Sequence, residues 1–221
     1  MFWFKRKKII VDAFVTQEKF ITYSPIDKAA KFFPQWFKDT PSTYNTGLFE
    51  TSTIKQCDGV LNMYRNSFII PLWTDLALSA ENGRLQYVPA DGGETPISSH
   101  ESEQWKTFVS PTEYCHLKLD SPWHLKTKEN INWIFQQPFW NSTPLDPVIL
   151  TPGMINYKYQ SATNINMLIN VKKNFKKVIP FNEPIIQIIP LTEKEVQIKH
   201  HVVSFVEWSN LKLPQIGRAH V

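Results

Sequence analysis

Histidines and acidic residues that could ligate a metal ion are the first candidates for chemistry in this sequence. Iron bound by two histidines and one carboxylate is a common catalytic centre, and His100, His116 and His124 with Asp120 could supply such ligands. The usual spacing places an acid two residues after the first histidine, whereas Asp120 follows His116 by four residues. Hydrogen-bonded or surface histidines are therefore the favoured interpretation, and a metal site is the lesser hypothesis.

The pair of adjacent histidines near the C-terminal end also argues against a metal site. His200 and His201 are adjacent in a segment that alternates like a strand. Successive side chains of a strand point to opposite faces, so these two imidazoles cannot enter one site.

Aromatic residues are concentrated in one proline-rich stretch. Trp123, Trp133, Phe139 and Trp140 lie within 18 residues, and the chain has eight tryptophans in all. Tryptophans in such loops can stack on sugar rings, cap an apolar pocket or form a subunit contact, but they can also belong to the core. Core packing is the favoured role, and Trp123, Phe139 and Trp140 are the candidates for ligand binding.

Asp75 is a further candidate because it interrupts the apolar run from Pro71 to Leu76. A buried carboxylate there would need partners, and it could orient a ligand. A solvent-facing strand position is the simpler explanation, and we favour it.

Motifs for other common chemistries are absent. None of the seven glycines lies in a phosphate-binding pattern, and the usual zinc-protease and nucleophile-elbow motifs do not occur. Cys57 and Cys115 are too few for a zinc site or a disulfide framework, so we expect two reduced thiols. No catalytic residue and no cofactor is predicted.

Charge and hydropathy limit the partners and the location. The formal charge of +4 comes entirely from Lys5, Arg6, Lys7 and Lys8, because the remaining basic and acidic residues balance. Residues 1–7 are thus a basic tip on a neutral body, and no nucleic acid partner is expected. No apolar run reaches the ~18 residues of a membrane span, and the N-terminus does not resemble a secretory signal. We expect a soluble, cytoplasmic protein.

The elements that must position these residues are short strands. Sixteen prolines divide the chain, with β-branched and aromatic residues between them. Ser24 and Pro25 predict one short N-terminal helix that ends at Phe33. A strand with an edge or bulge at Pro71 is expected over 67–78. Further strands are expected over 8–16, 104–109, 114–119, 131–137, 145–150, 164–171, 184–190 and 196–200. This pattern predicts a mostly β, single-domain fold over 8–215, of β-sandwich or jelly-roll type.

Four landmarks in order resemble a family of uncharacterised proteins of marine phages and bacteria. They are 25–29 with 33–38, Cys57 with 68–75, 119–127 and 184–191, and the resemblance spans most of residues 8–208. It implies a phage or environmental origin and supplies no catalytic residues. The chain departs from the bacterial members at Lys128-Glu129-Asn130, where a Pro-Gly-rich turn is expected, so no ligand contact of that loop can be carried over.

The last six residues look foreign to the domain. Ile216-Gly217-Arg218-Ala219-His220-Val221 matches one translated frame of a common sequencing adapter, and we expect 216–221 to be a sequencing artefact with no role in packing.

The sequence therefore favours a non-enzymatic β domain that binds a ligand or a partner, encoded by a phage. One alternative is a metal-dependent enzyme of the cupin or Fe(II)-oxygenase type, and another is a virion structural component. Homo-oligomerisation is compatible with each of these.

Overall fold

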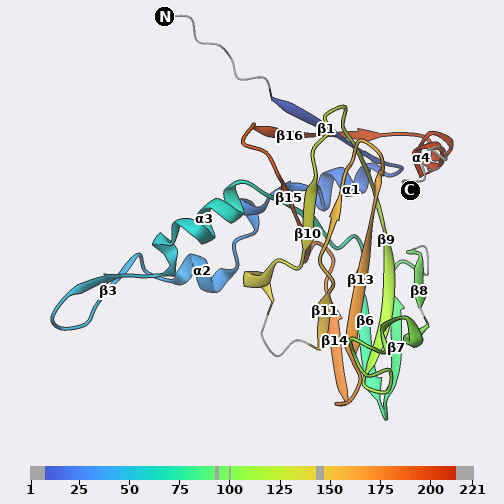
Figure 1. Cartoon of the computed structure of the whole chain (residues 1–221), viewed down its shortest axis with the longest axis horizontal. Coiled ribbons are helices and arrows are strands. Elements are labelled where there is room, and N and C mark those ends of the chain that lie inside the picture. The colour runs from blue at the N-terminus through green and yellow to red at the C-terminus, as the bar shows by residue number, and fades with distance from the viewer. Residues whose placement is uncertain (1–7, 93–94, 100, 143–146, 213–221) are drawn as a thin grey trace, which may run out of the picture.

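The computed structural model describes residues 8–92, 95–99, 101–142 and 147–212. Strands make up 44% of the structure and helices 19%, which confirms the expected mostly β class (Figure 1). Among the described helices, none is long and apolar enough to span a membrane. The basic tip 1–7 and the segment 216–221 lie outside the described residues.

The largest sheet is built around the first strand of the chain. Its order is β11-β13-β9-β1-β16, and β8 also pairs with β9. β1 runs parallel to β16, from Ile9 opposite Val196 to Val15 opposite Val202, and antiparallel to β9. The strands are β1 (Ile9–Val15), β8 (Ile97–Ser99), β9 (Tyr114–Lys126), β11 (Val148–Leu150), β13 (Ala162–Asn170) and β16 (Val196–Val202).

Two further sheets pack against the largest one. The first has the order β12-β10-β15-β5-β2, and the second has the order β14-β6-β7. Their strands are β2 (Asp27–Lys28), β5 (Phe68–Pro71), β6 (Leu76–Glu81), β7 (Arg84–Pro89), β10 (Trp133–Gln136), β12 (Gly153–Ile155), β14 (Phe175–Ile179) and β15 (Pro184–Pro190). The jelly roll and the single domain that we expected stay predictions.

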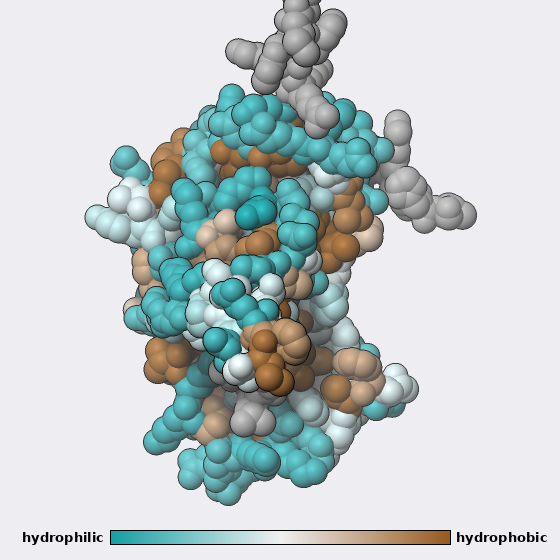
Figure 2. Space-filling view, turned by 90° about the vertical axis from the view of Figure 1, so that its left-hand side faces the viewer, coloured by the Kyte–Doolittle hydropathy of each residue, from teal (hydrophilic) through white to brown (hydrophobic). Residues whose placement is uncertain are grey.

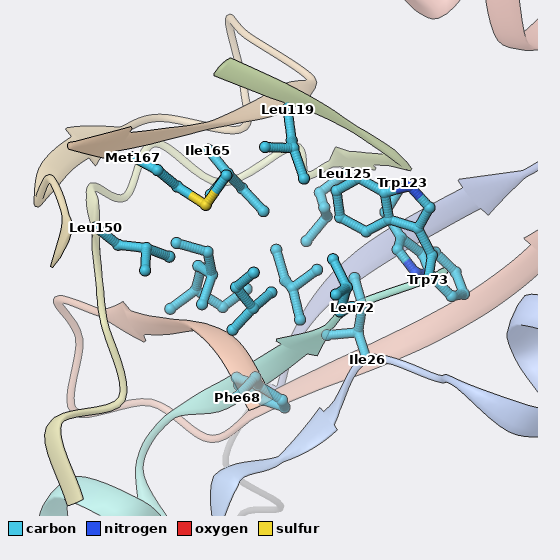
Figure 3. Packing of buried hydrophobic residues seen from close by; sticks show 14 of the residues in the cluster. Ile26, Phe68, Leu72, Trp73, Leu119, Trp123, Leu125, Leu150, Ile165 and Met167 are labelled. Carbon is cyan, nitrogen blue, oxygen red and sulfur yellow. The ribbon is translucent and has the colours of Figure 1, made fainter. Parts of the chain in front are cut away.

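The main core lies between these sheets. Alternate residues of β1 are buried, as a strand with one core-facing side requires. Leu119, Ile165 and Met167 of the largest sheet share one buried cluster with Phe68 and Leu72 from β5 and the turn after it, and their side chains converge in Figure 3.

An arm extends from this body (Figure 1). It contains α2 (Gln35–Asp39), the hairpin of β3 (Thr43–Asn45) and β4 (Glu50–Ser52), the 3-10 helix η2 (Ile54–Gln56), and α3 (Asp58–Arg65). A second, smaller cluster holds the base of the arm, with Phe37, Val60 and Tyr64 buried against Ile69 of β5. Figure 2 views the molecule from this end and shows apolar patches interrupted by hydrophilic surface.

The expectation of one short N-terminal helix over 25–33 is wrong. The first helix is α1 (Glu18–Tyr23), and residues 25–33 contain β2 and the 3-10 helix η1 (Ala29–Phe32). Tertiary pairing prevails over the local capping signal, because Asp27 and Lys28 pair with Ile69 and Phe68 of β5. The Asp27 carboxylate accepts a hydrogen bond from Lys28 N (2.7 Å) and pairs with Lys31.

The other local expectations have mixed outcomes. Pro71 lies opposite Pro184 at a register irregularity of the β5–β15 pair, so the bulge is confirmed. The run over 67–78 is two strands in different sheets, β5 and β6, because the chain turns between them. The strand expected over 104–109 is wrong: η3 (Ser102–Trp105) and a turn occupy it.

His200 and His201 project to opposite faces of β16, as expected. The His200 ring contacts Trp123 edge-on at 5.3 Å, and its Nε2 lies 3.0 Å from the Ile26 carbonyl oxygen. His201 Nε2 lies 2.8 Å from Asp12 Oδ1, and its ring stacks on Phe14.

The burial of His200 generates a prediction about pH. Burial lowers the pKa of His200 below its ordinary 6.5, while the hydrogen bond to Ile26 and the charge of Asp27 oppose this in part. Below pH 6.5 the unfolded chain takes up a proton that the folded chain resists, so the stability that neutral His200 provides declines as the pH falls.

We therefore expect wild type to lose stability relative to His200→Gln between about pH 7 and pH 5. The glutamine side chain can still donate a hydrogen bond to the Ile26 carbonyl, but it does not titrate. Urea unfolding at several pH values measures this, and parallel pH profiles for the two proteins would contradict it.

Candidate functional site

A pocket of about 350 Å³ lies where the ends of β1 and β16 approach β9. Its walls come from the segment after β1 and α1 (Glu18–Tyr23), from the loop before β8, from β9 and from α4 (Phe205–Lys212). The lining residues are Thr16, Gln17, Lys19, Phe20, Trp73, Asp91, Thr95, Pro96, Asp120, Ser121, Pro122, Phe205 and Trp208. Ligand sites usually have volumes of about 300–1,000 Å³, so the pocket suits a small molecule.

The parallel β1–β16 pair explains why these segments meet. Both strands run in the same direction and end in register at Val15 and Val202, and Val203 N donates to the Val15 carbonyl at 2.9 Å. The chain after β1 and the chain after β16 therefore leave the sheet at the same end (Figure 1).

The β9 wall lies at a break in strand pairing. On one side of β9, β8 pairs as far as Leu119, and β1 pairs from His124 onward. Asp120 N still donates to the carbonyl of Pro96, just before β8, at 3.2 Å, whereas residues 121–123 have no strand neighbour on that side within the described pairings. Pro122 lacks an N–H and needs no such partner, so the main sheet opens there at little cost in hydrogen bonds.

A series of hydrogen bonds holds the neighbouring wall, formed by Trp73 and the loop of Asp91 and Thr95, in place. Trp73 Nε1 donates to Thr95 Oγ1 at 3.1 Å, and the Thr95 hydroxyl donates to the Asp91 carboxylate. Trp73 and Thr95 are only 5% exposed. These hydrogen bonds position the Asp91 carboxylate at the pocket through two buried partners, Trp73 and Thr95.

α4 supplies the outer aromatic wall. Trp208 Nε1 donates to the Pro122 carbonyl at 2.9 Å, and the His124 ring lies 4.3 Å from the Trp208 ring. Phe205 is 70% exposed, and its ring lies 6.1 Å from that of Trp208 with only 21° between the planes. The helix thus presents two nearly parallel rings, one anchored to β9 and one open to solvent.

A capping box fixes the start of α4. Ser204 N donates to Glu207 Oε2 at 2.9 Å, and Glu207 N donates to Ser204 Oγ at 3.3 Å. The hydrogen bonds from the Ser204 hydroxyl and backbone N–H lower the pKa of the Glu207 carboxyl. The spacing Ser-x-x-Glu is a sequence signal for this helix, and it is the signal that our sequence analysis missed.

The charges at the pocket are mixed. Asp91 and Asp120 are acidic and Lys19 is basic. Asp120 also pairs with Lys118, whose Nζ lies 3.3 Å from Asp120 Oδ1. Among the described residues, the two acidic lining side chains are thus offset by Lys19 in the lining and by Lys118 beside Asp120.

The aromatic candidates from the sequence, Trp123, Phe139 and Trp140, do not line this pocket. Trp123 is fully buried in the main core, and Figure 3 shows its ring next to that of Trp73. Phe139 and Trp140 belong to the 3-10 helix η4 (Phe139–Asn141). The Trp140 carbonyl accepts a hydrogen bond from Trp36 Nε1 at 3.0 Å, so this segment supports the base of the arm. Phe139 is 62% exposed.

Asp75 is exposed and accepts hydrogen bonds from two backbone N–H groups. Its carboxylate accepts a hydrogen bond from Phe181 N at 2.5 Å, and its carbonyl accepts one from Ala90 N at 2.9 Å. These bonds tie the start of β6 to the ends of β7 and β14. The solvent-facing position that we favoured agrees with its exposure.

The described residues of the metal hypothesis, His116, Asp120 and His124, do not converge. His116, Asp120 and His124 are spaced four residues apart along β9, and four residues of a strand span about 13 Å. His116 Nδ1 accepts from Trp105 Nε1 at 3.2 Å, and its Nε2 lies 3.2 Å from Asn166 Oδ1. His100 lies outside the described residues. In the described ranges, no three His, Cys, Asp or Glu side chains could hold one metal ion.

Searches with this chain against protein-family models, curated proteins and solved structures gave no match. The resemblance to the phage and bacterial family therefore stays a prediction.

Sequence reasoning identified the neighbourhood of the pocket without its key residues. Asp120 was named for a metal, and Trp123 is next to Pro122 in the pocket wall. Trp73, Phe205 and Trp208 were missed as site residues, because they meet only after three distant segments fold together.

Replacements of Trp123 and Trp140 test which ring carries stability. We expect Trp123→Ala to lower the free energy of unfolding by about 3–5 kcal/mol, because it empties a fully buried site. Trp140→Ala, at a half-buried ring, should cost about 1 kcal/mol. Urea denaturation measures both.

Trp123→Phe is the matched control. Trp123 Nε1 has no hydrogen-bond partner in the described part of the chain, so phenylalanine loses ring volume but no hydrogen bond. Its cost should be well below that of alanine. An equal cost for Trp140→Ala and Trp123→Ala would contradict the assignment.

Proposed function

We propose that this chain is a non-enzymatic β domain that binds a small ligand in the pocket between α1, β9 and α4. The observation that carries the proposal is the pocket itself, which combines aromatic walls with a few fixed polar groups. Ligand sites commonly have this composition. Jelly-roll topology, cytoplasmic location and phage origin belong to the same proposal as predictions from the sequence.

The hydrogen bonding of the pocket favours binding over catalysis. Proton transfer or nucleophilic attack needs an accessible reactive group paired with a base at hydrogen-bond distance. The Thr95 hydroxyl does donate to the Asp91 carboxylate, but Thr95 is only 5% exposed and its oxygen also accepts from Trp73 Nε1, which gives this pair a positioning role. His124, whose ring contacts the pocket-lining Trp208, is 1% exposed and has Nδ1 3.0 Å from Ser161 Oγ. The rival hypothesis, a metal-dependent enzyme, has no converging ligand set to support it in the described ranges.

Fluorine NMR with 5-fluorotryptophan tests the site. Trp73 and Trp208 signals are assigned from Trp→Phe variants, and the protein is titrated with separate mixtures of monosaccharides, amines, amino acids and carboxylates. We expect one mixture to shift Trp208 and Trp73 while Trp36 and Trp140 stay unchanged, with the compound recovered unaltered.

Two results would overturn the proposal. One is that no mixture moves the Trp73 and Trp208 signals. The other is that the bound compound is converted to a product, which would indicate an enzyme.

A second candidate function is assembly with other copies of the chain, as in a virion component. The observation that favours it is the tip of the arm, where Leu48 is 85% and Phe49 is 74% exposed. Gly47, with φ of +89°, allows the turn that presents them. A two-stranded hairpin is marginally stable alone, and exposed apolar clusters commonly mark contact sites.

Light scattering with size-exclusion chromatography tests this function. We expect a mass above that of one chain, and we expect Phe49→Ser to reduce it to the monomer. Phe108→Ser is the matched control, because Phe108 is equally exposed at 73% but lies outside the arm. A monomeric wild type at every concentration would exclude assembly through the arm.

A further inference from the structure

We propose that the ligand of this pocket is a neutral carbohydrate of one or two rings, an inference that rests on the function proposed above. The rings of Phe205 and Trp208 would pack on a sugar face, while Asp91 and the neutral polar groups of the pocket would bind its hydroxyls.

The aromatic wall has the geometry that a sugar ring needs. One face of a pyranose carries axial C–H groups, and the negative face of an aromatic ring attracts such weakly positive hydrogens. Phe205 and Trp208 are nearly parallel, and Phe205 is mostly open to solvent. Trp208 is held through its indole N–H by Pro122, so ordering this ring costs the ligand little entropy.

The polar lining suits hydroxyl groups. Thr16, Gln17 and Ser121 add hydroxyl and amide groups that can both donate and accept hydrogen bonds. Asp91 is positioned by the Trp73–Thr95 chain, and a carboxylate accepts at about four lone-pair sites. A sugar hydroxyl can therefore donate to Asp91, and another can accept from the neutral groups.

The balance of charge favours a neutral ligand over an organic cation. An ammonium group would also pack on aromatic rings, and the two acidic side chains would attract it. Lys19 lines the same pocket, however, and Lys118 pairs with Asp120. A cation would meet repulsion from Lys19 and compete with Lys118, whereas a neutral sugar meets neither cost.

Calorimetric titration tests the ligand class with defined probes. The probes are the methyl glycosides of glucose, galactose, mannose and N-acetylglucosamine, with choline and glycerol as the cationic and the non-cyclic comparison. We expect saturable binding of at least one glycoside and no saturable binding of choline or glycerol.

Variants then connect the binding to the proposed contacts. Phe205→Ala should weaken the bound glycoside about tenfold, which corresponds to ~1.4 kcal/mol, and Asp91→Asn should weaken it by a similar factor. Phe108→Ala is the matched control for an exposed phenylalanine elsewhere and should leave the affinity unchanged. Thermal melts of each variant verify folding. If the alanine variant unfolds, the affinity of Phe205→Leu for the glycoside is measured in its place.

The outcomes separate this inference from the proposed function. Binding of choline instead, lost in Phe205→Ala, would overturn the carbohydrate assignment and leave ligand binding at the pocket intact. Glycoside binding that both variants retain would overturn the assignment of the sugar to this pocket. An absence of binding by every glycoside, with Trp73 and Trp208 fluorine signals unmoved by all mixtures, would overturn both proposals.

Discussion

The parallel pairing of β1 with β16 is the constraint on which the rest of the structure depends. It joins the first described strand to the last over seven consecutive residue pairs. Because β1 also pairs with β9, the main sheet is incomplete until the end of the chain arrives. Pairings this distant in sequence cost loop-closure entropy before they stabilise the fold, and the buried side of β1 provides the compensating apolar contacts.

The same pairing creates the candidate site. Two parallel strands that end together send their following segments to one end of the sheet, so α1 and α4 become neighbours there. β9 completes the wall because its pairing changes from β8 to β1 at 120–123. The site is thus a consequence of sheet topology: three distant segments meet where the sheet has a gap.

Six of the tryptophans have three different roles in the structure. Trp123 and Trp133 fill the main core, each without a hydrogen-bond acceptor for its indole N–H in the described chain. Trp36 and Trp140 join the arm to the body through a side-chain to backbone hydrogen bond. Trp73 and Trp208 line the pocket, where each indole N–H is bonded and the ring position is fixed. Composition alone does not distinguish these tasks, because all six residues are tryptophans near prolines or apolar runs.

The sequence by itself determined the features that depend on local periodicity and backbone chemistry. β-Branched content predicted β1, alternation predicted β16, the missing N–H of Pro71 required an edge or an irregularity, and adjacent positions put His200 and His201 on opposite faces. Tertiary structure decided what depends on distant partners. Pairing with β5 replaced the helix expected at Pro25, and Trp123 became core. The pocket formed from residues as far apart as Thr16 and Trp208, because contacts across such separations are set by strand order and register, which no local pattern encodes.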